Sequence, residues 1–178
     1  KYVKNKYSSN DNSWQIEKGD ILDSSYLKSL GKYDFVYSWG VLHHTGDMYQ
    51  ALENASKCVN DNGCLIIAIY NTQITTPIWK IIKKYYLSSP LLIQKILSYL
   101  FMIYFSLGLF FADLIRFRNP FLRYSSSTRG MNAYTDVIDW IGGYPFETAR
   151  PDEIISFYMK KGFSLENIRT VGGNMGCN

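Results

Sequence analysis

Short apolar runs separated by polar turns predict alternating strands and helices in the first half of the chain. Residues 33–38 form an aromatic and β-branched run that is typical of a buried strand. From Asp47, suited to cap a helix, apolar residues recur with a helical period up to Val59. After a predicted turn at 61–63, residues 64–70 are apolar without alternation, as in a strand covered on both faces. This strand–helix–strand order predicts an α/β fold with a doubly wound, mostly parallel sheet.

A helical segment and a polar tail make up the second half. Thr76 and Pro77 are suited to begin a helix. Its expected apolar side holds Ile78, Ile81, Ile82 and Tyr85, and its expected charged side holds Lys80, Lys83 and Lys84. Residues 96–112 are seventeen positions without a charge, just short of the roughly 20 that span a bilayer. We expect a buried or lid helix there, with a membrane-surface element as the alternative. Pro151 opens another helix, and 163–171 is a candidate strand.

These patterns predict a sheet interrupted by a helical insertion. Residues 1–71 would form the central part of the sheet, 72–128 a basic, apolar helical insertion or lid, and 129–178 the C-terminal part of the same domain. The chain has 178 residues, of which 47% are hydrophobic and 19% charged, so disorder is excluded and a sizeable core is possible. Its net charge of +4 is uneven, because residues 80–130 carry eight Lys or Arg and one Asp, a net +7.

The cysteine and histidine content argues against a metal site. Three scattered cysteines, Cys58, Cys64 and Cys177, do not make a disulfide framework or a metal knuckle. His43 and His44 are the only histidines, and adjacent histidines without further ligands are a poor metal pair. The cysteine usage favours a reducing setting, so we expect the protein to be cytoplasmic, or peripheral to a membrane if the apolar segment meets lipid.

Polar side chains gather in three segments, of which the first follows a short alternating stretch at 14–16 that is consistent with a strand, and the other two follow the strands predicted above. The segments are 19–23, 38–44 and Tyr70 with Asn71. Ligands bind beyond the carboxyl ends of the strands in an open parallel sheet, so these segments predict one pocket lined by a carboxylate, two imidazoles and an amide. A histidine with an ordinary pKa near 6.5 suits proton removal, although a structural role for the pair is the alternative.

Three stretches together resemble the latter part of a class I S-adenosylmethionine-dependent methyltransferase. They read GDILD at 19–23, YDFVYSWGVLHHTGDMYQAL at 33–52 and NGCLIIAIYN at 62–71, and the tail at 130–147 resembles one branch of the same enzymes. The resemblance implies a Rossmann-like sheet and S-adenosylmethionine as cofactor. It implies that the cofactor-binding residues are Asp20, on the adenine amino group, with Ile21, and Ser38, Trp39 and Gly40 along the methionine part.

The same resemblance implies methyl transfer to a small molecule. An oxygen or carbon acceptor is favoured over an amine. Amine methylases carry an N-P-P-Y-like sequence at the position where this chain has SWGV at 38–41. The expected catalytic residues are His43 and His44, and the expected substrate-binding residues are Asn71, Arg129 and Tyr144. The family's glycine-rich cofactor loop has no match, so we expect the chain to be a fragment that begins after the second strand of the fold.

Two other functions fit the same residues. A non-catalytic module of this fold would dock a partner or a membrane surface through residues 80–130, and another Rossmann-type protein would bind a different nucleotide. In an enzyme the segment 80–130 would be a lid, a surface for an anionic or lipid-like acceptor, or a face for a partner subunit. Nucleic acid is a poor fit, because the basic residues are scattered without an aromatic stacking platform.

Overall fold

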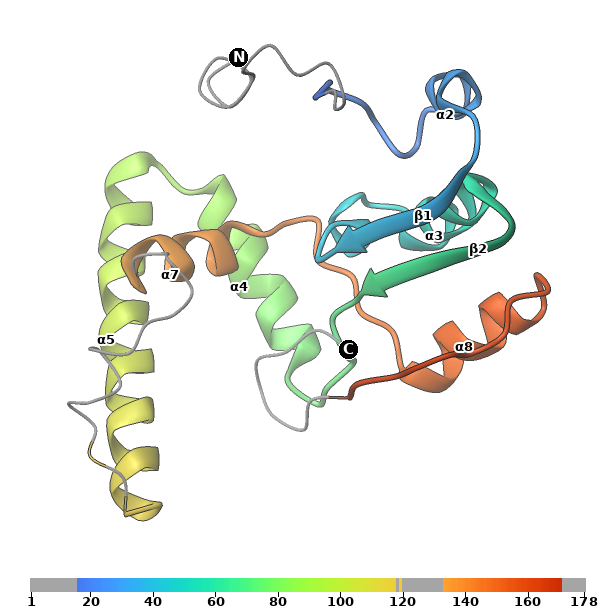
Figure 1. The fold of residues 1–178 in the computed structure, drawn as a ribbon. Coiled ribbons are helices and arrows are strands. Elements are labelled where there is room, and N and C mark those ends of the chain that lie inside the picture. Colours follow the sequence, from blue (N-terminus) through green and yellow to red (C-terminus); the bar gives the residue numbers. More distant parts are fainter. Residues whose placement is uncertain (1–15, 118, 120–132, 171–178) are drawn as a thin grey trace, which may run out of the picture. The chain divides into compact units, whose positions relative to one another are not determined.

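Helices and one small sheet make up the part of the chain described by this computed structural model, residues 16–117, 119 and 133–170 (Figure 1). The chain divides into two compact units, Lys1–Ile67 and Ala68–Asn178. Six α-helices and a two-stranded sheet lie in the described residues, so the predicted α/β class is confirmed. The finer division at residues 71 and 128 stays a prediction.

The first unit contains the predicted strand–helix–strand arrangement. Its elements are α2 (Ser24–Leu30), β1 (Tyr33–Trp39), the short 3-10 helix η1 (Leu42–His44), α3 (Met48–Lys57) and β2 (Val59–Ala68). The two strands are paired and run in the same direction, with α3 between them along the chain (Figure 1). Asp47 caps α3, because its Oδ1 accepts a hydrogen bond of 3.1 Å from the backbone N of Gln50. This arrangement corresponds to part of a Rossmann-like sheet.

The core of the first unit is built on the apolar side of α3. Met48, Leu52 and Ala55 are buried there, and Val59 continues the same side into β2, as the spacing predicts. Leu42 of η1 is also buried. Since α3 packs against η1, this core fixes the segment that follows β1.

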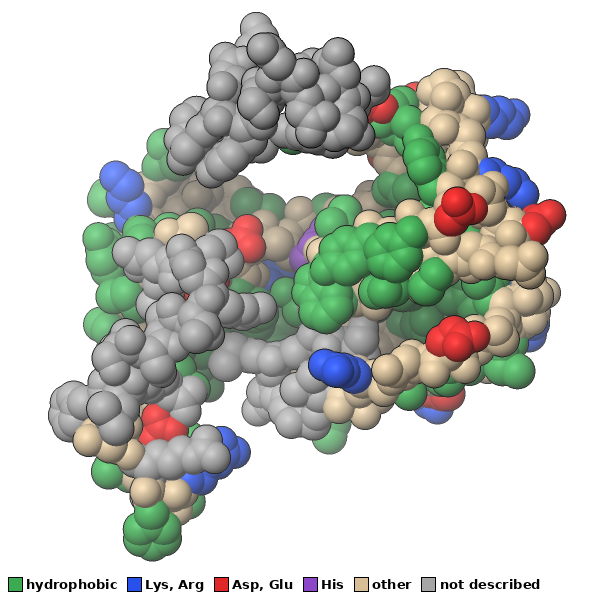
Figure 2. Space-filling view, in the orientation of Figure 1, with side chains coloured by type: hydrophobic (Ala, Val, Ile, Leu, Met, Phe, Trp, Pro, Cys, Tyr) green, Lys and Arg blue, Asp and Glu red, His purple; other side chains and the backbone are tan. Residues whose placement is uncertain are grey.

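The two strands differ from the prediction in extent and in burial. The predicted turn at 61–63 falls inside β2, which begins earlier than expected, and the chain does turn there: Asn62 has a left-handed φ of 66°, and a Cβ on Gly63 would lie 3.0 Å from the carbonyl oxygen of Asn60. The predicted burial of both strands is wrong, because Tyr33, Phe35, Tyr37 and Trp39 of β1 are each about half exposed, and β2 is exposed at several positions. Hydrophobic side chains accordingly gather over β1 in Figure 2. Within the described residues each strand pairs with one neighbour, so each keeps one edge unpaired there.

The second unit is mostly helical. Its helices are α4 (Thr76–Ser88), α5 (Leu91–Ile115), α7 (Ala133–Gly142) and α8 (Pro151–Met159). The predicted starts of α4 and α8 are confirmed to within a residue. Gly162, with φ of 86°, ends α8 in a Schellman motif, in which Gly162 N donates to Met159 O at 3.0 Å and Phe163 N to Tyr158 O at 3.1 Å. The strand expected at 163–171 is wrong over 163–170, which pair with no strand; residue 171 lies outside the described residues.

The side of α4 that packs is neither the apolar side nor the charged side that its spacing predicts. Ile78, Ile81 and Tyr85 are exposed, whereas Lys83 and Tyr86 are buried. An aromatic cluster sets this orientation: the ring of Trp79 lies 4.5 Å from that of Trp140 on α7, and it also contacts Phe101 and Phe105 of α5. Of the buried or lid helix expected at 96–112, the buried alternative is wrong, since Ser98 and Asp113 are the only buried side chains of α5, and the lid stays a prediction.

Candidate functional site

A hydrogen-bonded turn holds Asp20 directly before α2. The backbone N of Asp23 donates to the carbonyl of Asp20 at 3.1 Å, and the backbone N of Leu22 donates to Asp20 Oδ1 at 2.9 Å. The side chain of Asp20 is exposed, so its carboxylate remains accessible to a ligand. One oxygen of this carboxylate therefore caps the turn.

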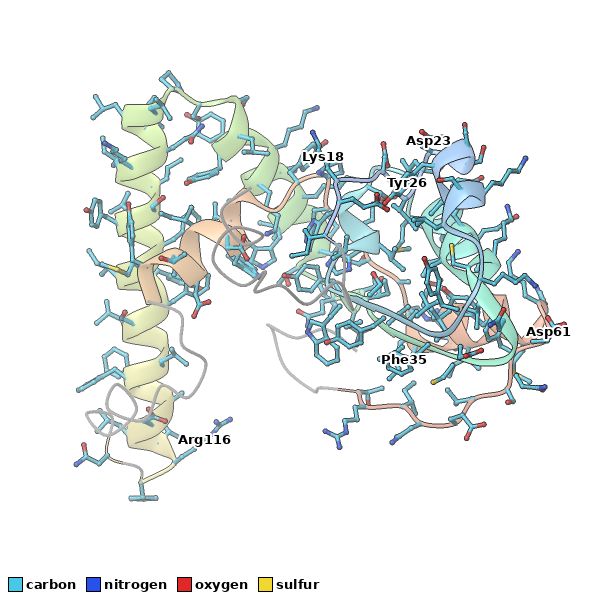
Figure 3. The ribbon with its side chains drawn as sticks, turned by 45° about the horizontal axis from the view of Figure 1, so that its top comes forward. Lys18, Asp23, Tyr26, Phe35, Asp61 and Arg116 are labelled. Atoms are coloured by element: carbon cyan, nitrogen blue, oxygen red, sulfur yellow. The ribbon has the colours of Figure 1, made fainter. Side chains whose placement is uncertain are left out.

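Asp23 has a structural role instead. It caps α2 by accepting hydrogen bonds from the backbone N of Tyr26 at 3.2 Å and of Ser25 at 2.9 Å. These bonds, first the one from Tyr26, hold the pKa of the Asp23 carboxyl below its usual range. Figure 3 shows Asp23 and Tyr26 together at α2. The two acids of the GDILD sequence therefore differ in role: Asp23 caps α2, whereas Asp20 lies in the turn before it.

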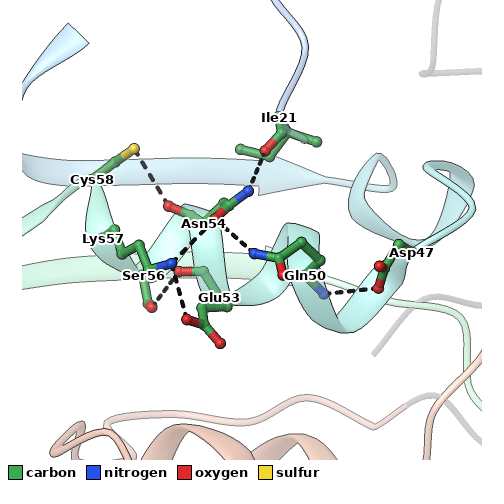
Figure 4. A network of polar contacts seen from close by, with 8 residues as sticks. All are labelled: Ile21, Asp47, Gln50, Glu53, Asn54, Ser56, Lys57 and Cys58. Carbon is green, nitrogen blue, oxygen red and sulfur yellow. Dashed lines mark hydrogen bonds and ion pairs between the residues drawn. The ribbon is translucent and has the colours of Figure 1, made fainter. Parts of the chain in front are cut away.

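Asn54 of α3 anchors the Asp20 turn (Figure 4). Its side chain is 2% exposed, and Nδ2 donates to the carbonyl of Ile21 at 2.9 Å. Its Oδ1 accepts from Gln50 Nε2 at 3.0 Å and from Lys57 Nζ at 3.4 Å. The sequence analysis missed Asn54. The signal that could have found it is the pair of polar residues on the same side of the predicted helix, Gln50 four residues before it and Lys57 three residues after it.

Ser38, Trp39 and Gly40 form the end of β1 and the bend after it. Ser38 is half-buried, and the Trp39 ring is about half exposed and stacked on Tyr37 with 6.2 Å between ring centroids. Gly40 has φ of 72°, and a Cβ placed on it would meet no atom within 4 Å. The glycine is therefore required by the left-handed backbone, and the space beside it is open.

Replacing Gly40 with alanine tests that requirement. We expect Gly40→Ala to lower the free energy of unfolding by about 1–2 kcal/mol through backbone strain alone. Gly108→Ala is the matched control: Gly108 lies inside α5 with no atom within 4 Å of an added Cβ, so the same change should stabilise by about 0.5–1 kcal/mol. Urea titration measures both. If Gly40→Ala were as stable as the wild type, the backbone at residue 40 would not require glycine.

The two histidines occupy η1 with different exposure. His43 is fully buried, and His44 is half-buried. Their ring centroids are 4.3 Å apart, and the ring planes are tilted by 55°. A general base must come within hydrogen-bond distance of the proton that it removes. Of the pair, His44 is therefore better placed to meet an acceptor, and the catalytic assignment of either residue stays a prediction.

The predicted substrate residues belong to the second unit. Asn71 pairs with Ala149 in an isolated parallel bridge, in which Thr72 N donates to Ala149 O at 3.1 Å. Tyr144 lies just after α7, and its backbone N donates to Gly142 O at 2.9 Å. Arg129 lies outside the described residues. The predicted convergence of these residues with Asp20 and the histidines stays a prediction.

The chemistry of the first unit fits an adenosine-containing cofactor. The exposed carboxylate of Asp20 can accept hydrogen bonds from an exocyclic amino group, and its turn is held by a buried amide. The open space beside Gly40 lets a ligand approach the backbone, next to the apolar surface of Trp39. In the described part of the chain, no three His, Cys, Asp or Glu side chains are grouped to hold a metal ion.

Comparison with known proteins identifies the family. A family model described as a methyltransferase domain matches residues 4–102, more than half of the chain. No curated protein and no solved structure matches significantly. The matched residues include the Asp20 turn, the end of β1, both histidines and Asn71. The chain therefore belongs to this methyltransferase family and is a class I S-adenosylmethionine-dependent methyltransferase.

Proposed function

We propose that this methyltransferase acts on an oxygen or carbon atom of a small-molecule acceptor. The observation that carries the proposal is the exposed carboxylate of Asp20, held in a turn that Asn54 ties to α3, the helix that packs against η1. One helix thus fixes both the proposed adenine-binding turn and the histidine pair. The sequence at 38–41 supports an oxygen or carbon acceptor, since it differs from the N-P-P-Y-like sequence of amine methylases.

In this proposal the residues of the first unit bind and orient the cofactor. Asp20 accepts a hydrogen bond from the adenine amino group, and Ile21 lies beside it. Ser38, Trp39 and Gly40 border the methionine part, where the open side of Gly40 admits the ligand. When bound, S-adenosylmethionine supplies a methyl group already activated by the sulfonium charge. The protein then contributes mainly alignment of donor and acceptor.

His44 is the residue that we propose as general base for a hydroxyl acceptor. Its neutral imidazole would take the hydroxyl proton as the oxygen bonds to the methyl group. The acceptor is proposed to contact Asn71, Arg129 and Tyr144. The protein is proposed to work in the cytoplasm.

Titration calorimetry with S-adenosylhomocysteine tests the cofactor site. We expect Asp20→Ala to raise the Kd about tenfold or more, equivalent to about 1.4 kcal/mol, because the adenine amino group loses a charged acceptor. Asp23→Ala is the matched control, since it removes a neighbouring acid that caps α2. The control should bind with a Kd near that of the wild type while losing about 1 kcal/mol of stability.

Two results would reject this assignment. One is an equal loss of affinity in Asp20→Ala and Asp23→Ala, which would mean that the site responds only to the fold of the segment. The other is the absence of any binding heat from the wild-type chain while its circular dichroism shows it folded.

A further inference from the structure

Helix α5 packs one of its sides against α4 and α7. Over its 25 residues the buried side chains are Ser98 and Asp113. Ser98 Oγ lies 3.0 Å from the hydroxyl of Tyr86 on α4, and Phe105 packs against Trp140 of α7 with 5.3 Å between ring centroids. The side of α5 that faces the rest of the second unit therefore carries the hydroxyl, the carboxylate and part of the aromatic cluster.

The opposite side of α5 is an unbroken apolar stripe. At 3.6 residues per turn seven large residues share it, each between 49% and 71% exposed: Leu92, Ile96, Leu100, Ile103, Leu107, Phe111 and Leu114. The charged residues of the helix, Lys95 and Asp113, lie on the other side. By length and composition alone, α5 is long and apolar enough to cross a membrane. A helix in water keeps its apolar side covered, so a large apolar stripe on the outer side indicates a further partner.

Helix α4 also exposes large apolar side chains. Ile78, Ile81 and Tyr85 are exposed on it together with basic residues, whereas Lys83 is fully buried. Exposed apolar residues on two adjacent helices indicate a further partner, because large contiguous apolar surfaces are rarely left in water.

We propose that the outer stripe of α5 inserts into the surface of a lipid bilayer that contains anionic headgroups. The inference is independent of the methyl-transfer proposal. Charge complementarity supports lipid: Lys80 and Lys84 are exposed beside Ile81 on α4, and Lys95 and Arg116 are exposed near the two ends of α5. Residues 80–130 carry a net +7. Basic residues that border an apolar helix face are the combination that binds anionic membrane surfaces.

The contacts of α5 favour an orientation along the membrane plane over a crossing. Around residues 98–105 its inner side is covered by α4 and α7, so lipid cannot surround the helix there. The uncharged stretch 96–112 is about 26 Å long at about 1.5 Å per residue, shorter than the roughly 30 Å hydrocarbon core. Only the outer stripe is thus available to lipid.

Vesicle flotation with a matched pair of variants tests the proposal. The probes are vesicles of phosphatidylcholine alone and of phosphatidylcholine mixed equally with phosphatidylglycerol. Ile103→Glu places a charge in the stripe, and Ile74→Glu makes the same change at a residue that is 99% exposed in the loop before α4. Both positions are exposed, so both variants should fold, which circular dichroism checks. We expect the wild type and Ile74→Glu to float with the mixed vesicles, and the partition coefficient of Ile103→Glu to fall about tenfold or more.

Anionic lipid and salt provide the second readout. Binding of the wild type should be stronger to the mixed vesicles than to phosphatidylcholine alone, and it should weaken as salt is added. Wild-type protein that stays in the soluble fraction, or equal flotation of Ile103→Glu and Ile74→Glu, would overturn the proposal. A soluble wild-type dimer that Ile103→Glu dissociates would overturn it too, and would assign the stripe to a second copy of the chain.

Discussion

The free energy of unfolding should rise by about 2–3 kcal/mol between about pH 8 and about pH 10.5, and Lys83→Met should abolish this rise. Lys83 is fully buried in the second unit. Burial lowers the pKa of its ammonium group from 10.5 to about 8, partly opposed by the charge of Asp139 on α7. The group donates to the carbonyl of Trp140, and its Nζ lies over the rings of Trp140 at 4.2 Å and Phe146 at 4.9 Å.

The sign follows from where the proton is held. Below about pH 8 Lys83 is charged in both states, and the folded protein bears the full cost of a buried ammonium group. Between about pH 8 and 10.5 the unfolded chain keeps the proton and the folded protein has lost it, so stability increases with pH. Above this window both forms are neutral and the dependence ends.

Denaturant titrations across this pH range measure the effect. Lys83→Met keeps the length of the side chain and removes the charge. Lys84→Met is the control, because Lys84 is exposed on the same helix and its removal should leave the wild-type profile unchanged. A Lys83→Met profile that rises as steeply as that of the wild type would show that another group titrates in this window.

Asn54→Ala should destabilise the first unit by about 2–3 kcal/mol and weaken S-adenosylhomocysteine binding several-fold. The substitution leaves the carbonyl of Ile21 without the buried donor that holds it at 2.9 Å. It also removes the acceptor of Gln50 and Lys57. Because Ile21 follows Asp20 directly, the turn that presents the carboxylate loses its attachment to α3.

Gln50→Ala is the matched control for Asn54. It removes one bond to Asn54 Oδ1 and leaves the bond to Ile21 in place, so the cofactor Kd should stay within about twofold of the wild type. Hydrogen exchange at the amide of Leu22, which donates to Asp20 Oδ1, should accelerate in Asn54→Ala only. Equal exchange at this amide in both variants would mean that Asn54 stabilises α3 without positioning the turn.

Local signals explain what the sequence predicted well. The cap of α3 needs only Asp47 and a backbone N three residues later, and the ends of α8 need only Pro151 and the left-handed Gly162. The family resemblance rests on residues that follow each predicted strand. Asp23 caps α2 for the same local reason, since its partners are two and three residues away.

The features that the sequence did not reveal depend on distant partners. Periodicity separates two sides of α4, but which side packs depends on Trp140, 57 residues beyond Lys83. Asn54 is bonded to Ile21, 33 residues away, and no pattern along α3 specifies that contact. The exposure of β1 likewise depends on which elements cover the sheet, so its apolar composition alone does not determine its burial.

The edge-to-face pair of Trp79 and Trp140 also gives the second unit an optical signature of its own. Two indole rings with centroids 4.5 Å apart couple their electronic transitions, which produces a circular dichroism band that disappears once α4 and α7 separate. The amide signal of the helices reports on both units, because each contains helical residues. Melting curves recorded at the two bands on the unmodified chain therefore reveal whether the units unfold together or in sequence.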